Sequence, residues 1–182
     1  MIKTATDVLA FWFDPENTEY LFAKSEEFDH KIYSEFYDTW EAACNGLLFD
    51  WRKTLEGRLA EIIVLDQFSR NLMRDNELAF SQDSMALVLS QELISQPGFA
   101  DQLSSQEKQF AYMPFIHSES KDIHVIALDL FESLGNKESL EYEIMHKRII
   151  DRFGRYPHRN LVLGRQSTDE ELAFLQEPNS SF

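Results

Sequence analysis

The clearest helical pattern of the chain lies at Ser25–Asn45, which reads SEEFDHKIYSEFYDTWEAACN. Large apolar side chains recur there at every fourth position, which places them on one face of an α-helix. They are Phe28, Ile32, Phe36 and Trp40. Ser25 can accept hydrogen bonds from the free amides of the first turn, and Gly46 suits the left-handed conformation in which helices often end. The stretch therefore predicts a long amphipathic helix whose aromatic stripe belongs to a core.

Seven further helical patterns flank this stretch, separated by Gly, Pro or polar residues. They cover residues 4–13, 54–71, 76–96, 104–113, 118–134 and 136–153, and a last short helix that Ser167 or Thr168 opens and that ends before Pro178. Ser104 and Glu107 form a predicted capping box, and Pro114 is expected to limit that helix. Residues 161–163 are the only candidate strand and are too short to carry a sheet. About eight helices joined by short loops predict an all-α domain with consecutive helices stacked as antiparallel pairs.

Length, charge and cysteine content narrow the class of protein. A chain of 182 residues predicts a single domain, placed at residues 1–176 and followed by a loose tail at residues 177–182. The net charge of −15 argues against a general nucleic-acid or anionic-membrane binder. The single cysteine, Cys44, excludes an intrachain disulfide and suits a reducing compartment. No signal-peptide pattern is found, nor an apolar run of the roughly 20 residues that span a bilayer, so we expect a cytoplasmic protein.

Positive charge is concentrated near the C-terminus of this acidic chain. Between Lys147 and Arg165 there are six Lys or Arg residues and one acid, Asp151. The overlapping stretch Arg152–Glu171 also contains two glycines, a proline, a histidine and an asparagine between two predicted helices. Charge and backbone constraint therefore coincide, which indicates a site.

Three polar motifs lie at predicted helix ends. They read LDQFSRN at 65–71, MPFIHSE at 113–119 and RFGRYPHRN at 152–160. Together with VLAFWF at 8–13 and GRQSTDEE at 164–171, these motifs resemble the signatures of the bacterial family called domain of unknown function 924. The resemblance covers residues 8–175 and implies a helical fold similar to tetratricopeptide-repeat domains, a right-handed array of helix pairs. It implies no activity and transfers no catalytic residue, so the site has to be argued from chemistry.

The motif at 152–160 offers planar cations to an anion. Arg155, Arg159 and Arg165 carry guanidinium forks that bind carboxylate or phosphate at two points, and His158 and Asn160 add directional donors. The structural alternative is that these arginines pair with acids of the chain and tie the loop down. The candidate acids are Asp66, Glu119, Glu170 and Glu171.

The motif at 113–119 contains a candidate proton carrier. His117 could act as a general acid or base, because the pKa of histidine lies near neutrality and Glu119 is close in sequence. Ser118 and Glu119 can also be interpreted as the cap and the first-turn acid of the next helix, which Ser118 or Ser120 opens.

The motif at 65–71 turns an apolar helix face polar at its end. Asp66 and Gln67 continue the stripe of the predicted helix 54–71, where a buried acid needs a partner. Arg70 follows Asp66 by four residues, and Asn71 follows Gln67 by the same spacing. Asp66 and Gln67 either form a structural group with Arg70 or line a pocket shared with Arg155 and His158. We expect the three motifs to converge.

Two functional hypotheses follow, and a third interpretation makes the polar clusters purely structural. The first is a binding module for a small anionic ligand or a peptide carboxylate, and the second is an enzyme that acts on a small anionic metabolite with His117 or His158 as general acid or base. The candidate ligand-binding residues are Asp66, Gln67, Arg70, Asn71, His117, Glu119, Arg155, His158, Arg159, Asn160 and Arg165. The histidines lack the spacing of zinc-binding helices and no cofactor motif is present, so we expect neither metal nor cofactor.

Overall fold

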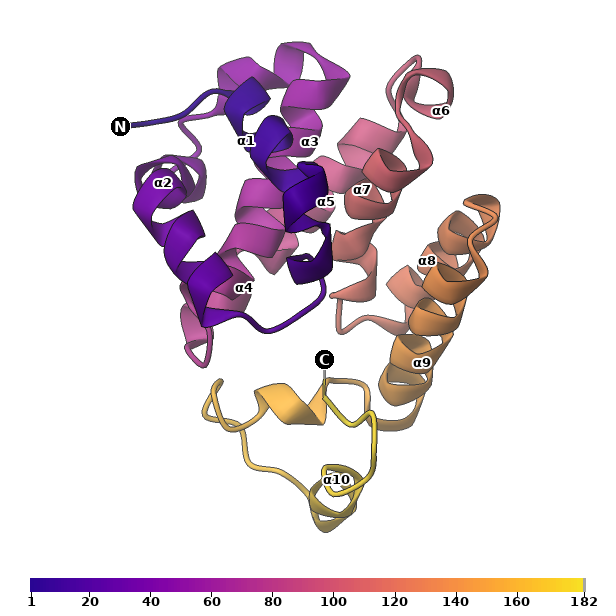
Figure 1. The fold of residues 1–182 in the computed structure, drawn as a ribbon. Coiled ribbons are helices and arrows are strands. Elements are labelled where there is room, and N and C mark those ends of the chain that lie inside the picture. Colours follow the sequence, from indigo (N-terminus) through magenta and orange to yellow (C-terminus); the bar gives the residue numbers. More distant parts are fainter. Residues whose placement is uncertain (182) are drawn as a thin grey trace. The chain divides into compact units, whose positions relative to one another are not determined.

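The computed structural model describes residues 1–181, and this part of the chain is helical without a strand (Figure 1). The all-α prediction is confirmed. By its internal contacts the chain divides into two compact units. Unit 1 is Met1–Arg74 with Leu78–Pro114, and unit 2 is Asp75–Glu77 with Phe115–Phe182.

Short connections join most of the helical elements. The first ones are α1 (Ala5–Trp12), η1 (Pro15–Tyr20), α2 (Glu26–Cys44), η2 (Phe49–Lys53), α3 (Leu55–Ile63), η3 (Val64–Phe68) and α4 (Ser69–Leu72). The later ones are η4 (Glu77–Phe80), α5 (Asp83–Ile94), α6 (Phe99–Gln102), α7 (Ser105–Ile116), α8 (Lys121–Ser133), α9 (Lys137–Phe153), η5 (Pro157–Arg159) and α10 (Asp169–Phe174). The η elements are 3-10 helices except η3, which is π-helical.

Capping residues place several helix starts where the sequence predicts them. The side chains of Ser25, Thr54 and Asn136 each accept from an amide of the first turn. Ser104 exchanges hydrogen bonds with Glu107 as a capping box. A second box joins Thr168 and Glu171 at α10. These contacts satisfy amides that have no partner within the helix, which is why short polar signals define the boundaries so well.

The predicted helix 54–71 is continuous but contains a π-helical turn. The extra residue of that turn lies in η3, between α3 and α4. Ser69 donates its hydroxyl proton to the carbonyl of Leu65 and accepts a hydrogen bond from the indole Nε1 of Trp40 at 2.8 Å. A buried side chain from α2 is thus held at the turn where the hydrogen-bond ladder widens.

Two predicted details at the end of α7 are wrong. The helix continues through Pro114 to Ile116, because a proline in the last turn removes only one hydrogen bond of the ladder. Of the two serines predicted to open the next helix, Ser120 is the N-cap of α8. The interpretation of Ser118 as the cap and Glu119 as a first-turn acid is therefore wrong. The side chain of Glu119 is instead available for long-range pairing.

The number of α-helices is ten in the described residues, against about eight expected. The π-helical turn separates α3 from α4, and the short α6 follows the left-handed Gly98. The predicted helix 76–96 is divided into η4 and α5. The stacking of these helices in a tetratricopeptide-like array stays a prediction.

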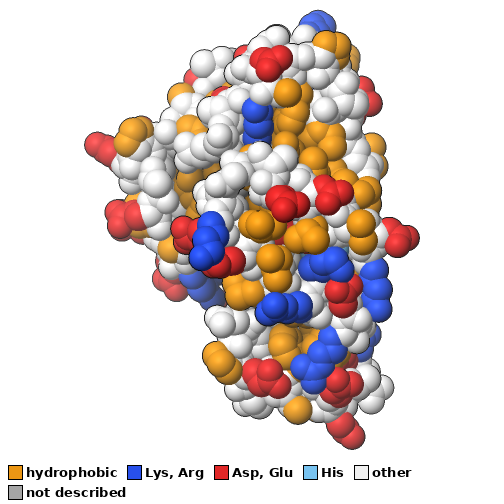
Figure 2. Space-filling view, turned by 90° about the vertical axis from the view of Figure 1, so that its right-hand side faces the viewer, with side chains coloured by type: hydrophobic (Ala, Val, Ile, Leu, Met, Phe, Trp, Pro, Cys, Tyr) orange, Lys and Arg blue, Asp and Glu red, His pale blue; other side chains and the backbone are white. Residues whose placement is uncertain are grey.

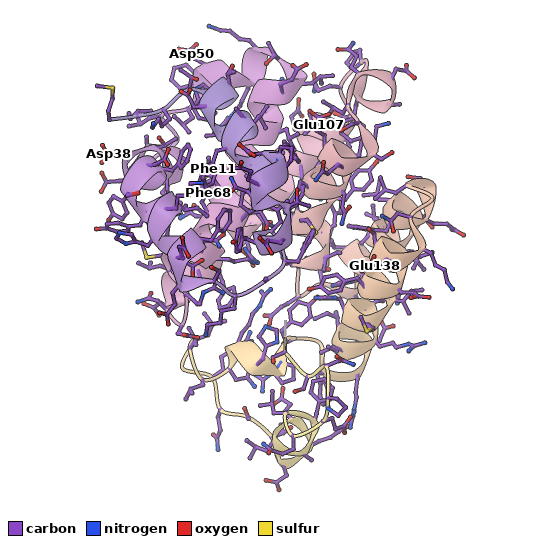
Figure 3. The ribbon with its side chains drawn as sticks, viewed as in Figure 1. Phe11, Asp38, Asp50, Phe68, Glu107 and Glu138 are labelled. Carbon is purple, nitrogen blue, oxygen red and sulfur yellow. The ribbon has the colours of Figure 1, made fainter. Side chains whose placement is uncertain are left out.

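An aromatic core fills unit 1. The stripe of α2 is buried as predicted, with Phe28 at 3% and Phe36 at 1% exposure. Phe11 of α1 and Phe68 of η3 approach each other edge to face, with ring centroids 6.3 Å apart (Figure 3). The helix α3 packs against α1 and α5, while α2 packs against η3 and α4.

Cys44, the last residue of α2, is half-buried, and burial raises the pKa of its thiol to about 11.

A helical hairpin and a C-terminal loop region form unit 2. The helices α8 and α9 lie side by side and antiparallel, joined by a tight turn (Figure 1). A small core of Ile149, Ile150, Tyr156 and Phe174 connects α9 with α10. No helix of the described chain is long and apolar enough to cross a membrane. Phe182, the last residue of the predicted tail, lies outside the described residues.

Candidate functional site

Arg155 is bound at two points by Glu171. Its Nε and Nη2 donate to the two carboxylate oxygens at 2.6 and 2.8 Å, and Nη2 also donates to the carbonyl of Gln166 at 2.9 Å. The hydrogen bonds from Arg155, aided by the amide of Thr168, lower the pKa of Glu171 to about 2 against the opposing effect of burial. The ion pair fastens the start of α10 to the loop that follows α9.

Arg165 makes the same type of contact with Glu119. Its Nη1 and Nη2 donate to the carboxylate oxygens at 2.6 and 2.9 Å. The backbone amide of Tyr156 donates to the same carboxylate at 2.7 Å. Burial by itself would raise the pKa of Glu119, but these hydrogen bonds and the charge of Arg159 lower it on balance.

Asn160 joins the two ion pairs into one network. Its amide nitrogen donates to the hydroxyl of Ser167 at 3.0 Å and to Glu171 at 3.3 Å. Its amide oxygen accepts from Nε of Arg165 at 2.9 Å. Asn160 is 1% exposed, and these three hydrogen bonds hold the loop itself together. Arg155 and Arg165 thus pair with two of the acids predicted as structural partners, Glu171 and Glu119.

Tyr156 is the centre of a second group of side chains in unit 2. Its ring is 1% exposed, and the centroids of the rings of His124, His146 and His158 lie 6.3, 5.7 and 5.6 Å from it. The guanidinium carbon of Arg159 stands 4.6 Å from the ring centroid, a cation–π distance. His117 directly follows Ile116, whose carbonyl accepts a hydrogen bond from the Tyr156 hydroxyl. We call Tyr156, His117, His124, His146, His158 and Arg159 the Tyr156 cluster.

Four of the five histidines of the chain belong to this cluster. Burial lowers the pKa of His146 to about 3, and the charges of His117, His124 and His158 act in the same direction. The Nδ1 of His146 lies 2.8 Å from the carbonyl of Tyr142, which fits a neutral ring that donates from Nδ1. His117 and His158 are half-buried, whereas Arg159 is 6% exposed. The cluster therefore combines a permanent cation with imidazoles of different exposure.

His124 faces Glu143 across the hairpin of α8 and α9. The Nδ1 of His124 lies 2.9 Å from Oε1 of Glu143, and both side chains are fully buried. The Nε2 of the same ring lies 2.9 Å from the carbonyl of Ser118 and 3.2 Å from the hydroxyl of Tyr156. Burial raises the pKa of Glu143, although the contact with His124 opposes this effect.

The first motif forms its own polar group in unit 1. Arg70 donates to Asp66 at 3.2 Å, which confirms the predicted helical pair, and it binds both oxygens of Asp83 at 2.9 and 3.0 Å. The amide nitrogen of Gln67 donates to Asp66 at 2.7 Å. The amide nitrogen of Asn71 donates to Asp29 at 2.8 Å. The convergence of this motif with the other two stays a prediction.

Sequence reasoning missed four members of the unit 2 arrangement: Tyr156, His124, His146 and Glu143. The signal was present, because Glu143 and His146 stand three residues apart on the same helix face that ends in Ile149 and Ile150. Polar residues on an apolar stripe require partners.

The described residues contain no group of three or more side chains suited to hold a metal ion. On the face drawn in Figure 2, basic side chains lie beside acidic ones, in agreement with the extensive pairing.

The fold and the network define an all-helical protein with two compact units and a histidine-rich cluster in the second. The chain belongs to the family described as "Bacterial protein of unknown function (DUF924)", which matches residues 8–179. It is similar to the solved structure of the protein of unknown function ATU0120 from Agrobacterium tumefaciens, with 33% sequence identity and a TM-score of 0.89. That match covers 94% of this chain and 96% of the other. None of the curated proteins matches this chain.

Proposed function

We propose that unit 2 binds a small anionic ligand, a carboxylate or a phosphate, at the Tyr156 cluster. The observation that carries the proposal is the placement of a buried guanidinium, Arg159, on the Tyr156 ring in a cluster that also holds the half-buried His117 and His158. The chain as a whole carries a charge of −15 and repels anions, so binding needs a local concentration of donors and positive charge. The cluster supplies both.

The residues of the cluster differ in role. Arg159 supplies a charge that is independent of pH and a planar fork that matches carboxylate and phosphate oxygens. His117 and His158 supply N–H donors. His146 stays neutral at physiological pH because burial lowers its pKa to about 3. Arg155 and Arg165, held by Glu171 and Glu119, keep the loop in shape rather than contact the ligand.

Thermal unfolding in the presence of anions tests this proposal. We expect inorganic phosphate or citrate to raise the melting temperature of the wild-type protein above that in chloride of equal ionic strength. Arg159→Met should abolish the effect, because it removes the cation and keeps an apolar body on the Tyr156 ring. Arg152→Met is the matched control, since Arg152 is an exposed arginine of the same segment, paired with Glu170.

The result that would overturn the proposal is a wild-type protein that neither phosphate nor citrate stabilises. The proposal would also be overturned if phosphate or citrate stabilised the wild type and Arg159→Met equally. Because Arg159 is buried, the second variant is His117→Asn at a half-buried position. This variant should fold and bind the anion more weakly.

Catalysis on an anionic substrate is the second candidate function. It is favoured by the two half-buried imidazoles of His117 and His158, which can exchange protons with a bound molecule. Incubation of the protein with a panel of phosphomonoesters, followed by phosphorus NMR, distinguishes turnover from binding. Product release that His117→Asn or His158→Asn abolishes would support an enzyme, whereas binding without release supports a binding module.

A further inference from the structure

We propose that Glu143 is a positioning residue, which fixes the ring of His124 and through it the loop that carries His117. This inference rests on the proposed function, in which His117 contacts the ligand. Glu143 is fully buried on α9 and belongs to none of the three motifs of the sequence.

The loop between α7 and α8 is held on both sides of His117. The hydroxyl of Tyr156 donates to the carbonyl of Ile116, the residue before His117. The carbonyl of Ser118, the residue after it, lies 2.9 Å from Nε2 of His124. Glu119 is fastened next to them by Arg165. The backbone around His117 is therefore preorganised, as binding groups require.

The contact with Ser118 determines the tautomer of His124. A carbonyl oxygen only accepts hydrogen bonds, so Nε2 of His124 has to carry a hydrogen. The Tyr156 hydroxyl directs its own hydrogen to Ile116, which leaves an oxygen lone pair toward the ring. Both neighbours of Nε2 thus select the same form of the imidazole.

Glu143 completes this selection at the opposite nitrogen. One proton lies between Nδ1 of His124 and Oε1 of Glu143, which are 2.9 Å apart. The other oxygen, Oε2, is buried without a hydrogen-bond partner, a costly position for a carboxylate and a less costly one for a neutral acid. Burial raises the pKa of Glu143 in agreement with the neutral form. The pair therefore orients the ring at both ends without placing a net charge in the interior.

Nitrogen NMR of the histidine rings in the full-length protein tests the inference. In the wild type at neutral pH, Nε2 of His124 should be protonated. Glu143→Gln should preserve this form, because its amide nitrogen can donate to Nδ1. Glu143→Met should lose the ring orientation, shift the signals of His117 and weaken phosphate binding relative to Glu143→Gln, because a methionine side chain cannot hydrogen-bond Nδ1 of His124.

Two results would overturn the inference. One is a wild-type His124 ring protonated at Nδ1 and not at Nε2, a measurement that needs no variant. The other is a folded Glu143→Met protein whose His117 signals equal those of the wild type. Absence of phosphate-induced shifts at His117 in the wild type would refute the proposed function instead, since the ring signals report positioning without ligand.

Discussion

Arg165 and Glu119 are 46 residues apart in the chain, and their side chains meet in a two-point ion pair at 2.6 and 2.9 Å. Arg165 lies in the loop region between α9 and α10. A second ion pair, between Arg155 and Glu171, fastens the same region to the start of α10. Because Arg165 also donates to Asn160, the two ion pairs act as one support for the backbone around Tyr156.

Glu119→Gln is expected to lower the free energy of unfolding by about 2 kcal/mol, the usual contribution of hydrogen bonds to a charged group. Urea unfolding measures the effect. Glu170→Gln is the control, because the Arg152–Glu170 pair is solvent-exposed and its loss should change the free energy by less than about 0.5 kcal/mol. Equal effects of the two variants would contradict a special role for Glu119.

Acid should destabilise the protein through His146. The pKa of His146 is about 3 in the folded state and 6.5 in an unfolded chain. Between pH 6.5 and pH 3 the unfolded state therefore binds a proton at this residue that the folded state does not bind. Stability from this residue is complete above pH 6.5 and decreases as the pH falls toward 3, by about 2 kcal/mol at pH 5. Denaturant titrations at pH 7 and pH 5 measure the loss. His146→Gln should show a smaller decrease between the two values, and an unchanged decrease would disprove the assignment.

Ser69→Ala should cost about 1–3 kcal/mol, because it leaves the buried indole N–H of Trp40 without its acceptor. Thermal and urea unfolding are suitable measurements. Ser34→Ala provides the comparison, since Ser34 is exposed and bonds only the carbonyl of Lys31 within its own helix. If Ser69→Ala proved as mild as Ser34→Ala, the contact between Ser69 and Trp40 would contribute little to stability.

Gly154→Ala should destabilise by about 1 kcal/mol through backbone strain alone. Gly154 ends α9 with φ of +69°, and an added Cβ would meet no atom within 4 Å. At Gly57 an added Cβ would lie 2.0 Å from the carbonyl oxygen of Trp51, so Gly57→Ala should cost more than about 2 kcal/mol. Unfolding midpoints of the two variants rank them, and the reverse order would refute this explanation.

The sequence by itself determined the all-α class and most helix boundaries. Caps such as Thr54, Asn136 and Thr168 act on amides within four residues, and the left-handed Gly154 ends its helix locally. Such signals need no knowledge of the rest of the chain. Such signals are less reliable where two neighbouring residues could each cap a helix, as Ser118 and Ser120 could before α8. They are also less reliable where a proline lies near a helix end, as in α7.

Only the tertiary structure decided which acid binds which arginine. Arg155 finds Glu171 at a separation of 16 residues and Arg165 finds Glu119 at 46, choices that side-chain chemistry alone left open. The four histidines of the Tyr156 cluster likewise come from three parts of the chain, namely α8 with the loop before it, α9, and η5. The physical reason is that helix starts depend on contacts with near neighbours, whereas a buried charge or imidazole takes its partner from whichever helix the packing brings beside it.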